Sequence, residues 1–422
     1  MSETIDTQIP KSSREKNRQA QKLVLFDLAI YGHHPAYIQY LVQYWCEQQW
    51  QGHLDIVVSP QFLQAHGEVV ATAHSQKNIN FVPIRVAEET ALKPRHSSLS
   101  RHHRAWQEWQ LLCQYVEQLG ANHCLIMYFD PYQLPLALGA KPPCRFSGIY
   151  FRPTLHYSKF PNYVQTWKSQ LQQWREKWLL RKTLQNSRLQ TLFTLDPFAV
   201  QAINQFCPQQ KVIHLSDPVV IPDSTRFESN HLRETLGVES GRKVFLLFGA
   251  LTRRKGIYQL LEAVHLLPSS LCEKLCLAFV GKASPKEQNK LQAHIAALRE
   301  VQPVQVIETY KFICEQQVPV YFQMADVVLA IYQQHVGMSG ILLLAAAAQK
   351  PVLSSDYGLM GEMTRRHQLG LVVDSTQPQE IVKGLALFLL ESPAQEWDCN
   401  QMKQFAAQNS PQRFAQTILE NI

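Results

Sequence analysis

The chain has 422 residues, of which 45% are hydrophobic and 18% are charged, and it carries a formal net charge of +7. A chain of this length is expected to form about two or three domains around a large core. The mildly basic charge allows anionic ligands, nucleic acid or acidic lipid, whereas the longest apolar runs, such as GILLLAAAA at 340–348, fall short of the ~20 residues that a membrane-spanning helix needs.

The first 21 residues are polar, with a short basic run and no apolar core of the kind that a signal peptide contains. We expect residues 1–21 to form a disordered basic tail, and a weak contact with anionic lipid is the alternative. The nine cysteines are scattered singly, without a Cys-x-x-Cys pair. This usage indicates reduced thiols and a cytoplasmic protein.

Short apolar runs alternate with helical segments from Leu23 onward. They are too apolar for a sheet with one solvated face, so they predict parallel strands that helices cover on both sides. In the first half these runs lie at 23–30, 54–59, 124–129, 146–151 and 191–195. After a polar linker at 224–241 the pattern restarts, with runs at 243–251, 275–281, 304–310, 326–332 and 351–356.

The two series predict an α/β protein with two doubly wound, Rossmann-like domains and an interdomain cleft that holds the ligand site. We place the N-terminal domain at 22–220 and the C-terminal domain at 221–400. The segment 401–422 is predicted to be a C-terminal helix, and it is a candidate for packing back across the cleft.

The segment QQHVGMSG at 333–340 lies between an apolar run and a helix that is apolar all round. Such a loop falls at the carboxyl end of a parallel strand, where open α/β sheets bind ligands. The helix N-terminus carries unpaired N–H groups and a partial positive charge, and Gly337, Met338, Ser339 and Gly340 would let an anion approach it. The alternative is that Ser339 is an ordinary N-cap on a core helix.

The stretch FGALTRRKG follows another strand of the same predicted sheet. It combines a glycine at the strand end with three cations, and cations beside a glycine-opened helix end would suit a diphosphate. The alternative is that Lys255 belongs to a solvated helix start. A third turn, DYGLMGE, offers Glu362 at the same edge, either as a ligand contact or as a surface acid. The residues concerned in FGALTRRKG are Gly249, Arg253, Arg254 and Lys255.

These segments resemble the retaining glycosyltransferases of family four, which have the GT-B fold. The matching stretches are FGALTRRKGIYQLLEAV, CLAFVGKA, QMADVVLAIY and GMSGILLLAAAAQKPVLSSDYGLMGEM, within residues 243–375. In the first half, YGHHPAYIQYLVQYW is similar to the family's glycine loop and first helix. The resemblance implies a hexosyltransferase (EC 2.4) that moves a sugar from a nucleotide-diphosphate sugar to a lipid, polysaccharide or other glycan with retention of configuration. It implies no essential metal and no cofactor beyond the nucleotide sugar.

The resemblance also implies donor binding by the second domain and acceptor binding by the first. Lys255 matches the family's diphosphate-binding lysine, whereas Ala250 stands where the family often has an arginine. One of the two arginines before Lys255 could replace that arginine, and the backbone near Phe312 would hold the nucleobase. The catalytic candidates are His156, Arg254 and Lys255, and the candidate donor contacts are Gly249, Arg253, Lys255, Phe312, Gly337, Met338, Ser339, Gly340 and Glu362.

The family's two glutamates, which are spaced eight residues apart, fall at Val336 and Leu344 in this chain. Two outcomes therefore stay open. Either the donor is held through Gly337, Ser339 and Glu362, or the chain is a non-catalytic nucleotide-sugar or glycan-binding homologue that has lost transfer. The chemistry that the resemblance implies is a front-face substitution in which the departing diphosphate takes the acceptor's proton, so the protein's part is mainly electrostatic.

Polar residues also follow the predicted strands of the first half. YGHHP places Gly32 and His34 after the first strand, YFDPY contains Asp130, and YFRPTLHYS contains Arg152 and the histidine named above. His34 would bind a sugar hydroxyl or a phosphate, or else it is a structural histidine. Asp130 is either an acceptor contact or a turn former. The candidate acceptor contacts are Gly32, His34, Asp130 and Arg152.

The segment 166–188 has Trp167, Leu171, Trp174 and Trp178 at helical spacing, surrounded by lysines and arginines. One interpretation is a core-packing stripe with basic flanks. The other is a helix on an anionic membrane surface, which would place the protein peripherally on the inner face of a membrane. Elsewhere the basic residues form no long stripe interleaved with aromatic residues, which argues against nucleic acid as a partner.

Overall fold

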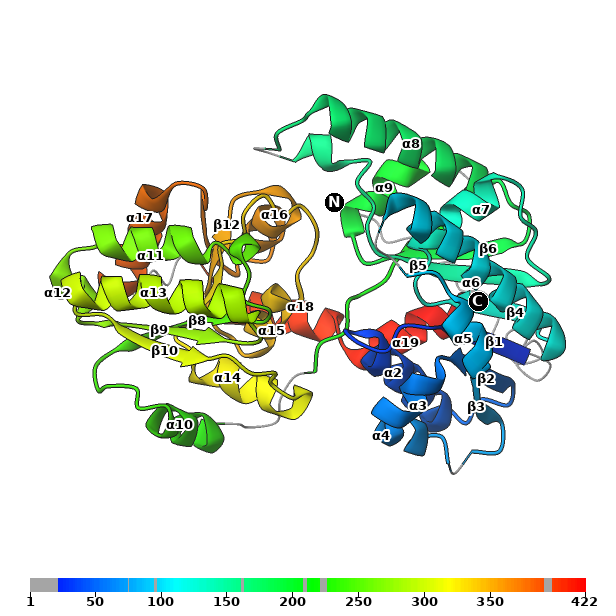
Figure 1. Cartoon of the computed structure of the whole chain (residues 1–422), viewed down its shortest axis with the longest axis horizontal. Coiled ribbons are helices and arrows are strands. Elements are labelled where there is room, and N and C mark those ends of the chain that lie inside the picture. Colours follow the sequence, from blue (N-terminus) through cyan, green and yellow to red (C-terminus); the bar gives the residue numbers. More distant parts are fainter. Residues whose placement is uncertain are drawn as a thin grey trace. The chain divides into compact units, whose positions relative to one another are not determined.

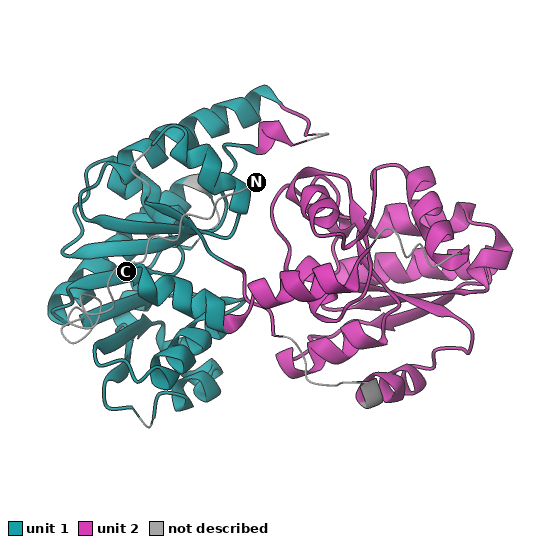
Figure 2. Cartoon of the chain, turned by 180° about the vertical axis from the view of Figure 1, so that it is seen from behind, with its two compact units in different colours: residues 1–156, 166–215, 412–422 teal, residues 157–165, 216–411 magenta. Residues whose placement is uncertain are grey.

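The computed structural model describes residues 22–74, 76–94, 97–160, 163–207, 211–220, 226–390 and 397–422. The chain divides into two compact units (Figure 2). Unit 1 comprises residues 1–156, 166–215 and 412–422, and unit 2 comprises residues 157–165 and 216–411. The tail predicted at 1–21 and the first residues of the linker predicted at 224–241 lie outside the described residues.

Unit 1 contains a seven-stranded sheet in the order β3-β2-β1-β4-β5-β6-β7, in which all strand pairs are parallel. The strand order reverses between β1 and β4, so the carboxyl ends of these two strands flank a topological switch point. The strands are β1 (Lys22–Asp27), β2 (His53–Val58), β3 (Ile79–Pro83), β4 (His123–Ile126), β5 (Arg145–Tyr150), β6 (Leu189–Thr194) and β7 (Val212–His214).

Helices cover both faces of this sheet (Figure 1). Side chains of β1 alternate between two core clusters, with Val24 and Phe26 in one and Leu23 and Leu25 in the other. This alternation explains why the strands read as continuous apolar runs. The helices are α2 (His34–Glu47), α3 (Pro60–Ala65), α4 (Gly67–Ala71), α5 (Val86–Ala91), α6 (Ser98–Gln118), α7 (Gln133–Ala137), α8 (Trp167–Leu184) and α9 (Pro197–Asn204), with the 3-10 turn η1 (Asp130–Tyr132). A further 3-10 turn, η2 (Tyr157–Lys159), belongs to unit 2.

Unit 2 contains a six-stranded parallel sheet in the order β10-β9-β8-β11-β12-β13, whose switch point lies between β8 and β11. Both sheets confirm the two doubly wound α/β domains that the apolar runs predict. The strands are β8 (Lys243–Phe248), β9 (Leu275–Val280), β10 (Gln305–Thr309), β11 (Val327–Ala330), β12 (Val352–Ser355) and β13 (Gly370–Val373).

The helices of unit 2 include the short, almost wholly buried α15, whose alanines pack closely, as its sequence suggests. Among the described residues, no helix is long and apolar enough to cross a bilayer. The helices are α10 (Arg226–Thr235), α11 (Ile257–Leu266), α12 (Ser269–Cys272), α13 (Pro285–Val301), α14 (Val318–Met324), α15 (Gly340–Ala347), α16 (Gly358–Arg366), α17 (Pro378–Leu390) and α18 (Cys399–Gln408), with the 3-10 turns η3 (Arg253–Lys255) and η4 (Glu315–Gln317).

The C-terminal segment contains two helices, α18 and α19 (Pro411–Glu420), where the sequence predicted one. The break has a local cause, because Pro411 lacks the backbone N–H that a continuing helix would need. Figure 1 shows α19, in red, beside α2, in blue. Phe414 of α19 meets Tyr37 of α2 with 4.6 Å between ring centroids, and both residues belong to one core cluster of unit 1. The chain therefore ends in the unit in which it begins.

Candidate functional site

The candidate donor site lies at the switch point of unit 2, where the loops after β8 and β11 meet. Gly249 follows β8 with a φ of 101°, and η3 then leads through Gly256, whose φ is 75°, into α11. A side chain at Gly256 would overlap the carbonyl oxygen of Ile331 at the end of β11. The glycine therefore allows the two loops to approach each other, and this approach brings their polar side chains together.

Lys255 lies inside this site and not at a solvated helix start. Its side chain is buried, with 6% of the residue exposed. The ammonium donates to the carbonyl oxygen of Phe248 and to the hydroxyl of Tyr332, which is 2.8 Å away. It also lies 4.7 Å from the centroid of the Tyr332 ring. The sequence expectation that Lys255 could simply begin a solvated helix is wrong, because the loop after β11 covers it.

Ser339 shares Tyr332 as a partner. Its hydroxyl donates to the Tyr332 hydroxyl at 3.2 Å, and it accepts a 3.5 Å bond from the N–H of Ile341 as the N-cap of α15. Ser339 is therefore the N-cap of α15, and its contact with an anion stays a prediction. A Cβ at Gly340 would meet nothing within 4 Å, and one at Gly337 would come no closer than 3.6 Å to its nearest neighbour. The loop before α15 is therefore open around the Cα atoms of these two glycines.

Tyr332 is the residue that sequence reasoning missed. It was counted as the last residue of an apolar run, yet its hydroxyl connects the Lys255 ammonium to Ser339. The residue is buried, and a buried tyrosine hydroxyl normally needs a partner. A tyrosine at the end of a predicted buried strand, directly before a glycine-containing loop, could therefore have indicated a polar partner in this site.

The loop after β11 is held by polar contacts that also position Arg254. The guanidinium of Arg254 lies 3.0 Å from Nδ1 of His335 and 5.8 Å from the centroid of the Tyr332 ring. The N–H of Gln333 donates to the carbonyl oxygen of Arg254 at 2.8 Å. These contacts bring the Arg254 side chain to this site.

Phe312 stands at the same edge of the sheet, after β10. Its ring is 66% exposed, and the ammonium of Lys282 lies 5.0 Å from its centroid. The loops after β8 and β9 are in close contact here, because a side chain at Gly281 would overlap the carbonyl oxygen of Gly249. An exposed aromatic ring at this position offers a flat apolar surface for a base.

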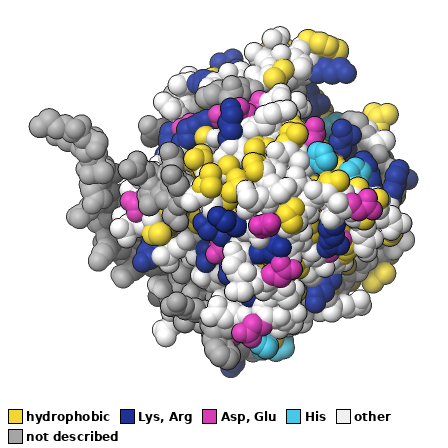
Figure 3. All heavy atoms as spheres, turned by 90° about the vertical axis from the view of Figure 1, so that its left-hand side faces the viewer, with side chains coloured by type: hydrophobic (Ala, Val, Ile, Leu, Met, Phe, Trp, Pro, Cys, Tyr) yellow, Lys and Arg dark blue, Asp and Glu magenta, His cyan; other side chains and the backbone are white. Residues whose placement is uncertain are grey.

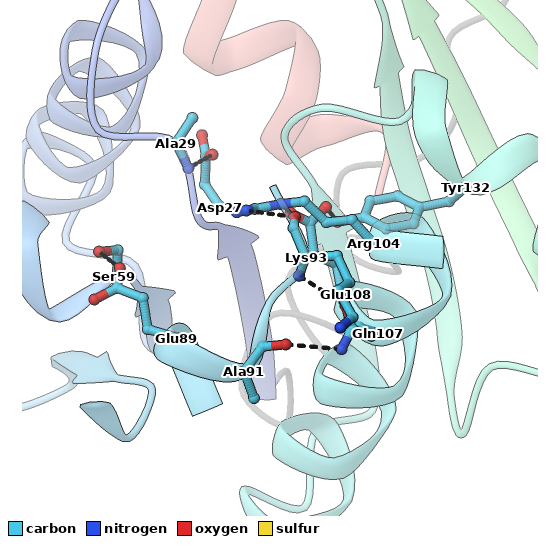
Figure 4. A network of polar contacts seen from close by, with 10 residues as sticks. All are labelled: Asp27, Ala29, Ser59, Glu89, Ala91, Lys93, Arg104, Gln107, Glu108 and Tyr132. Atoms are coloured by element: carbon cyan, nitrogen blue, oxygen red, sulfur yellow. Dashed lines mark hydrogen bonds and ion pairs between the residues drawn. The ribbon is translucent and has the colours of Figure 1, made fainter. Parts of the chain in front are cut away.

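A second polar group occupies the switch point of unit 1. Asp27 ends β1 and His34 begins α2, and Nδ1 of His34 lies 2.6 Å from the Asp27 carboxylate. The other oxygen of Asp27 accepts the N–H of Ala29 at 2.9 Å, as Figure 4 shows at the tip of β1. Gly32, with a φ of 85°, turns the chain between them. His34 therefore has a fixed carboxylate partner, which sets the orientation of its ring.

The same view includes polar groups that follow the neighbouring strand. Ser59, the residue after β2, donates a hydrogen bond to Glu89 of the segment that follows β3 (Figure 4). Arg104 and Glu108 of α6 form an ion pair at 2.6 Å, and Arg104 also donates to the carbonyl oxygen of Lys93. Polar side chains thus collect at the carboxyl edge of this sheet as they do in unit 2.

Asp130 and Arg152 lie on the loops after β4 and β5. The two carboxylate oxygens of Asp130 accept the N–H groups of Phe151, at 2.9 Å, and Arg152, at 3.1 Å. Burial raises the pKa of Asp130 to about 7, against the opposing effect of these bonds and of the Arg152 charge. The carboxylate thus holds the loop after β5, a role that neither sequence alternative included, while Arg152 remains exposed.

His156 is placed differently from the sequence expectation. It is 2% exposed, and its Nε2 lies 3.0 Å from the carboxylate of Asp196, which in turn caps α9 through the N–H groups of Phe198 and Ala199. The side chain therefore faces the interior of unit 1 and helps to hold α9. This burial and the Asp196 contact favour a structural role for His156, and its contact with a donor sugar stays an untested prediction.

Comparisons with known proteins bear on the family match and on the fold. Residues 228–409 match the family model of the glycosyl transferases group 1. The candidate glycosyltransferase YtcC of Bacillus subtilis (strain 168) is 27% identical over 155 residues, which span 36% of this chain and only 38% of that relative. Two solved structures are similar over the whole chain: Anabaena Alr3699/HepE in complex with UDP and glucose, and sucrose-phosphate synthase from Thermosynechococcus elongatus.

Both structures are 14% identical to this chain, with TM-scores of 0.64 for HepE and 0.66 for the synthase. In each case the match covers 95% of this chain and 98% of the solved one. The chain has the GT-B fold, and its residues 228–409 match the group 1 family model. The resemblance stated from the sequence is thereby confirmed for the fold and for the domain of unit 2.

Val336 and Leu344, where the resemblance implies the family's two glutamates, lie in the loop before α15 and on α15. Val336 lies against Gly358, where a Cβ would come within 2.8 Å of the Val336 backbone, and Leu344 is half-buried on α15. Glu362, which was a candidate substitute, forms a 3.2 Å ion pair with Arg366 one turn further along α16. Among the described residues, no group of His, Cys, Asp and Glu side chains is arranged to hold a metal ion.

Proposed function

We propose that this chain transfers a sugar, a hexose by preference, from a nucleotide-diphosphate sugar to a glycan or lipid-linked acceptor with retention of configuration. One observation supports this proposal above all: Lys255 and Ser339 both donate hydrogen bonds to the Tyr332 hydroxyl, near the N-terminus of α15. A cation and two hydroxyls beside a helix N-terminus form a site with the chemistry that a diphosphate requires.

The partners of the Lys255 ammonium favour an anionic ligand. Its described hydrogen-bond acceptors, the carbonyl oxygen of Phe248 and the hydroxyl of Tyr332, are both neutral. Burying a charge against neutral partners costs free energy that an incoming phosphate would offset. The Tyr332 hydroxyl accepts from both Lys255 and Ser339, so within the described residues its own proton is left to donate to a phosphate oxygen.

In the proposed reaction these groups stabilise the leaving group, the nucleoside diphosphate. The bond between the sugar C1 and the β-phosphate oxygen breaks, and the acceptor oxygen forms a bond to C1 on the same face. The acceptor proton passes to the departing diphosphate, whose growing charge is stabilised by Lys255, by Arg254 and by the N–H groups of α15. We keep the expectation that no cofactor beyond the nucleotide sugar takes part, since the chain itself supplies the cations.

We assign acceptor binding to unit 1, with the Asp27–His34 pair as its centre. The 2.6 Å contact fixes Nδ1 of His34, which leaves Nε2 to meet an acceptor hydroxyl or phosphate. Arg152 is exposed nearby in the loop that Asp130 holds. The proposed location is the cytoplasm, where nucleotide sugars are the expected donors.

A second function, binding of nucleotide sugars without transfer, is favoured by one observation. The two family glutamate positions carry Val336 and Leu344, neither of which can accept a hydrogen bond from a ribose or sugar hydroxyl through its side chain. A chain that binds the diphosphate but lacks these contacts would retain affinity and lose turnover.

The experiment that separates the two functions pairs calorimetry with a hydrolysis assay. UDP-, GDP- and ADP-glucose are titrated into the full chain, and release of the free nucleoside diphosphate is then followed with and without a glycan acceptor. Binding together with release of the nucleoside diphosphate supports transfer, and binding without release supports the second function. Absence of binding by all three donors contradicts both.

A further inference from the structure

Helix α8 exposes a row of large apolar side chains. Trp167 is 70% exposed, Leu171 57%, Trp174 67% and Trp178 41%. At about 100° per residue these four positions lie within one narrow stripe of the helix. The core-packing interpretation of this stripe is therefore wrong. Single exposed apolar residues are common, but a continuous row that includes three tryptophans marks a surface that binds something.

The opposite face of α8 is the one that packs on unit 1. Leu180 and Leu184 join the core, and the only acidic residue of the helix, Glu176, points inward. Glu176 accepts hydrogen bonds from the Tyr150 hydroxyl at 2.5 Å and from the Thr154 N–H at 2.8 Å. These contacts fix the rotation of α8 about its axis, so the tryptophan row is held outward by the structure itself.

Basic side chains border the row on both sides. With about 100° of rotation per residue, two basic side chains lie along one border of the row and three along the other, and all five are exposed. Because Glu176 is buried, the exposed surface of α8 carries positive charge alone. The face of unit 2 in Figure 3, by contrast, mixes basic and acidic side chains. The borders consist of Lys177 and Arg181 on one side and Lys168, Arg175 and Lys182 on the other.

The neighbouring helix α6 adds to this positive surface. Arg101 is exposed near the start of α6. Burial, and then the charges of Arg175 and Arg101, lower the pKa of His102. The positive field thus extends beyond α8 itself.

We infer that the tryptophan row of α8 docks on the surface of a bilayer that contains anionic lipid. Tryptophan rings favour the headgroup region, where an apolar ring and a polar N–H are both accommodated, and lysine and arginine on the borders meet lipid phosphates. The exposed part of α8 presents positive charge alone, which complements the phosphates of an anionic bilayer. The docking goes beyond the proposed transfer and does not depend on it, since a chain without turnover would dock equally.

The test is sedimentation of the full chain with vesicles of phosphatidylcholine alone and of phosphatidylcholine mixed with phosphatidylglycerol. We expect binding to the mixed vesicles only, with roughly a fivefold loss of partitioning for each basic side chain neutralised near the surface. The charge variant combines Lys177→Gln and Arg181→Gln, and added salt should weaken wild-type binding because it screens exposed charges.

The apolar part is tested with the double variant Trp174→Ala and Trp178→Ala. We expect its partitioning to fall at least tenfold, and the wild-type tryptophan fluorescence to shift to the blue on mixed vesicles. The matched control replaces two exposed leucines of unit 2, Leu266→Ala and Leu387→Ala, and should bind like the wild type. Circular dichroism and thermal unfolding check that each variant is folded.

Three results would overturn the inference. One is equal or absent binding of the wild type to both vesicle types. Another is unchanged partitioning of a folded Trp174→Ala, Trp178→Ala variant. The third is a wild-type dimer in sedimentation velocity that the tryptophan substitutions dissociate, since the row would then be an interface between two copies. Donor titration on the same variants keeps this test separate from the proposed transfer, because docking can fail while donor binding persists.

Discussion

Replacing Lys255 by methionine removes the positive charge of the proposed diphosphate site while keeping an unbranched side chain in the buried channel. The ammonium now donates to the Phe248 carbonyl oxygen and to the Tyr332 hydroxyl. In the proposed complex it would also form a charge-assisted hydrogen bond to a phosphate oxygen. Such a bond contributes about 1.5–3 kcal/mol. We therefore expect Lys255→Met to weaken nucleoside-diphosphate binding by roughly 10- to 150-fold.

The assay compares two ligands that differ only in the diphosphate. A thermal-shift screen first identifies which of UDP, GDP and ADP binds, and calorimetry then measures that diphosphate and its nucleoside for wild type and Lys255→Met. The diphosphate should lose affinity, and the nucleoside should not. Lys274→Met, which alters an exposed lysine just before β9 and thus at the opposite edge of the sheet, is the matched control. Unchanged diphosphate affinity in a folded Lys255→Met variant would refute the reasoning.

Three further predictions concern the same structure. Tyr332→Phe and Ser339→Ala remove two hydroxyls that bond each other at 3.2 Å, so their effects on the free energy of unfolding should be non-additive by about 0.5–1 kcal/mol in a double-mutant cycle measured by urea unfolding; additive effects would contradict the contact. Gly281→Ala should destabilise the fold by about 1–3 kcal/mol, because its φ is 139° and the methyl group would overlap a carbonyl oxygen of the β8 loop, whereas Gly340→Ala should stay within about 0.5 kcal/mol and yet weaken diphosphate binding. A stable Gly281→Ala variant in thermal unfolding would argue against the close approach of the two loops. The pKa of Asp130 is raised from 3.8 to about 7, so the folded state binds the proton more tightly than the unfolded state and its stability should fall as the pH rises between these values; Asp130→Asn should remove that part of the pH dependence, and identical slopes for variant and wild type would contradict it.

The strands of both sheets could be predicted from the sequence because their residues are buried on two faces. Leu23 and Leu25 point into one cluster of unit 1 and Val24 and Phe26 into the other, so the strand is a continuous apolar run that few other structures produce. Lys255 could be predicted as well, since a cation after a strand-end glycine is a local feature of the chain.

The partners of these residues could not be predicted, because they depend on which strands lie side by side. Tyr332 meets Lys255 only because β11 pairs with β8, although β9 and β10 separate them in the sequence. For helix α8, the sequence likewise could not show which face is buried. Helical spacing places Trp174 and Trp178 on one face, but the choice of the packed face is made by Glu176, whose partners come from β5 and the loop after it.

The site of unit 2 also suggests which part of donor recognition the group 1 domain has kept. The groups gathered around the Tyr332 hydroxyl, Lys255 and Ser339, are suited to phosphate oxygens and carry no means of distinguishing one sugar from another. The positions at which the family places its carboxylates, Val336 and Leu344, are those where ribose and sugar hydroxyls would be recognised, and here their side chains are apolar. The proposed function therefore predicts that affinity for the diphosphate and selectivity for the sugar are separable in this chain, with selectivity supplied by the backbone of the loop after β11 or by residues outside unit 2.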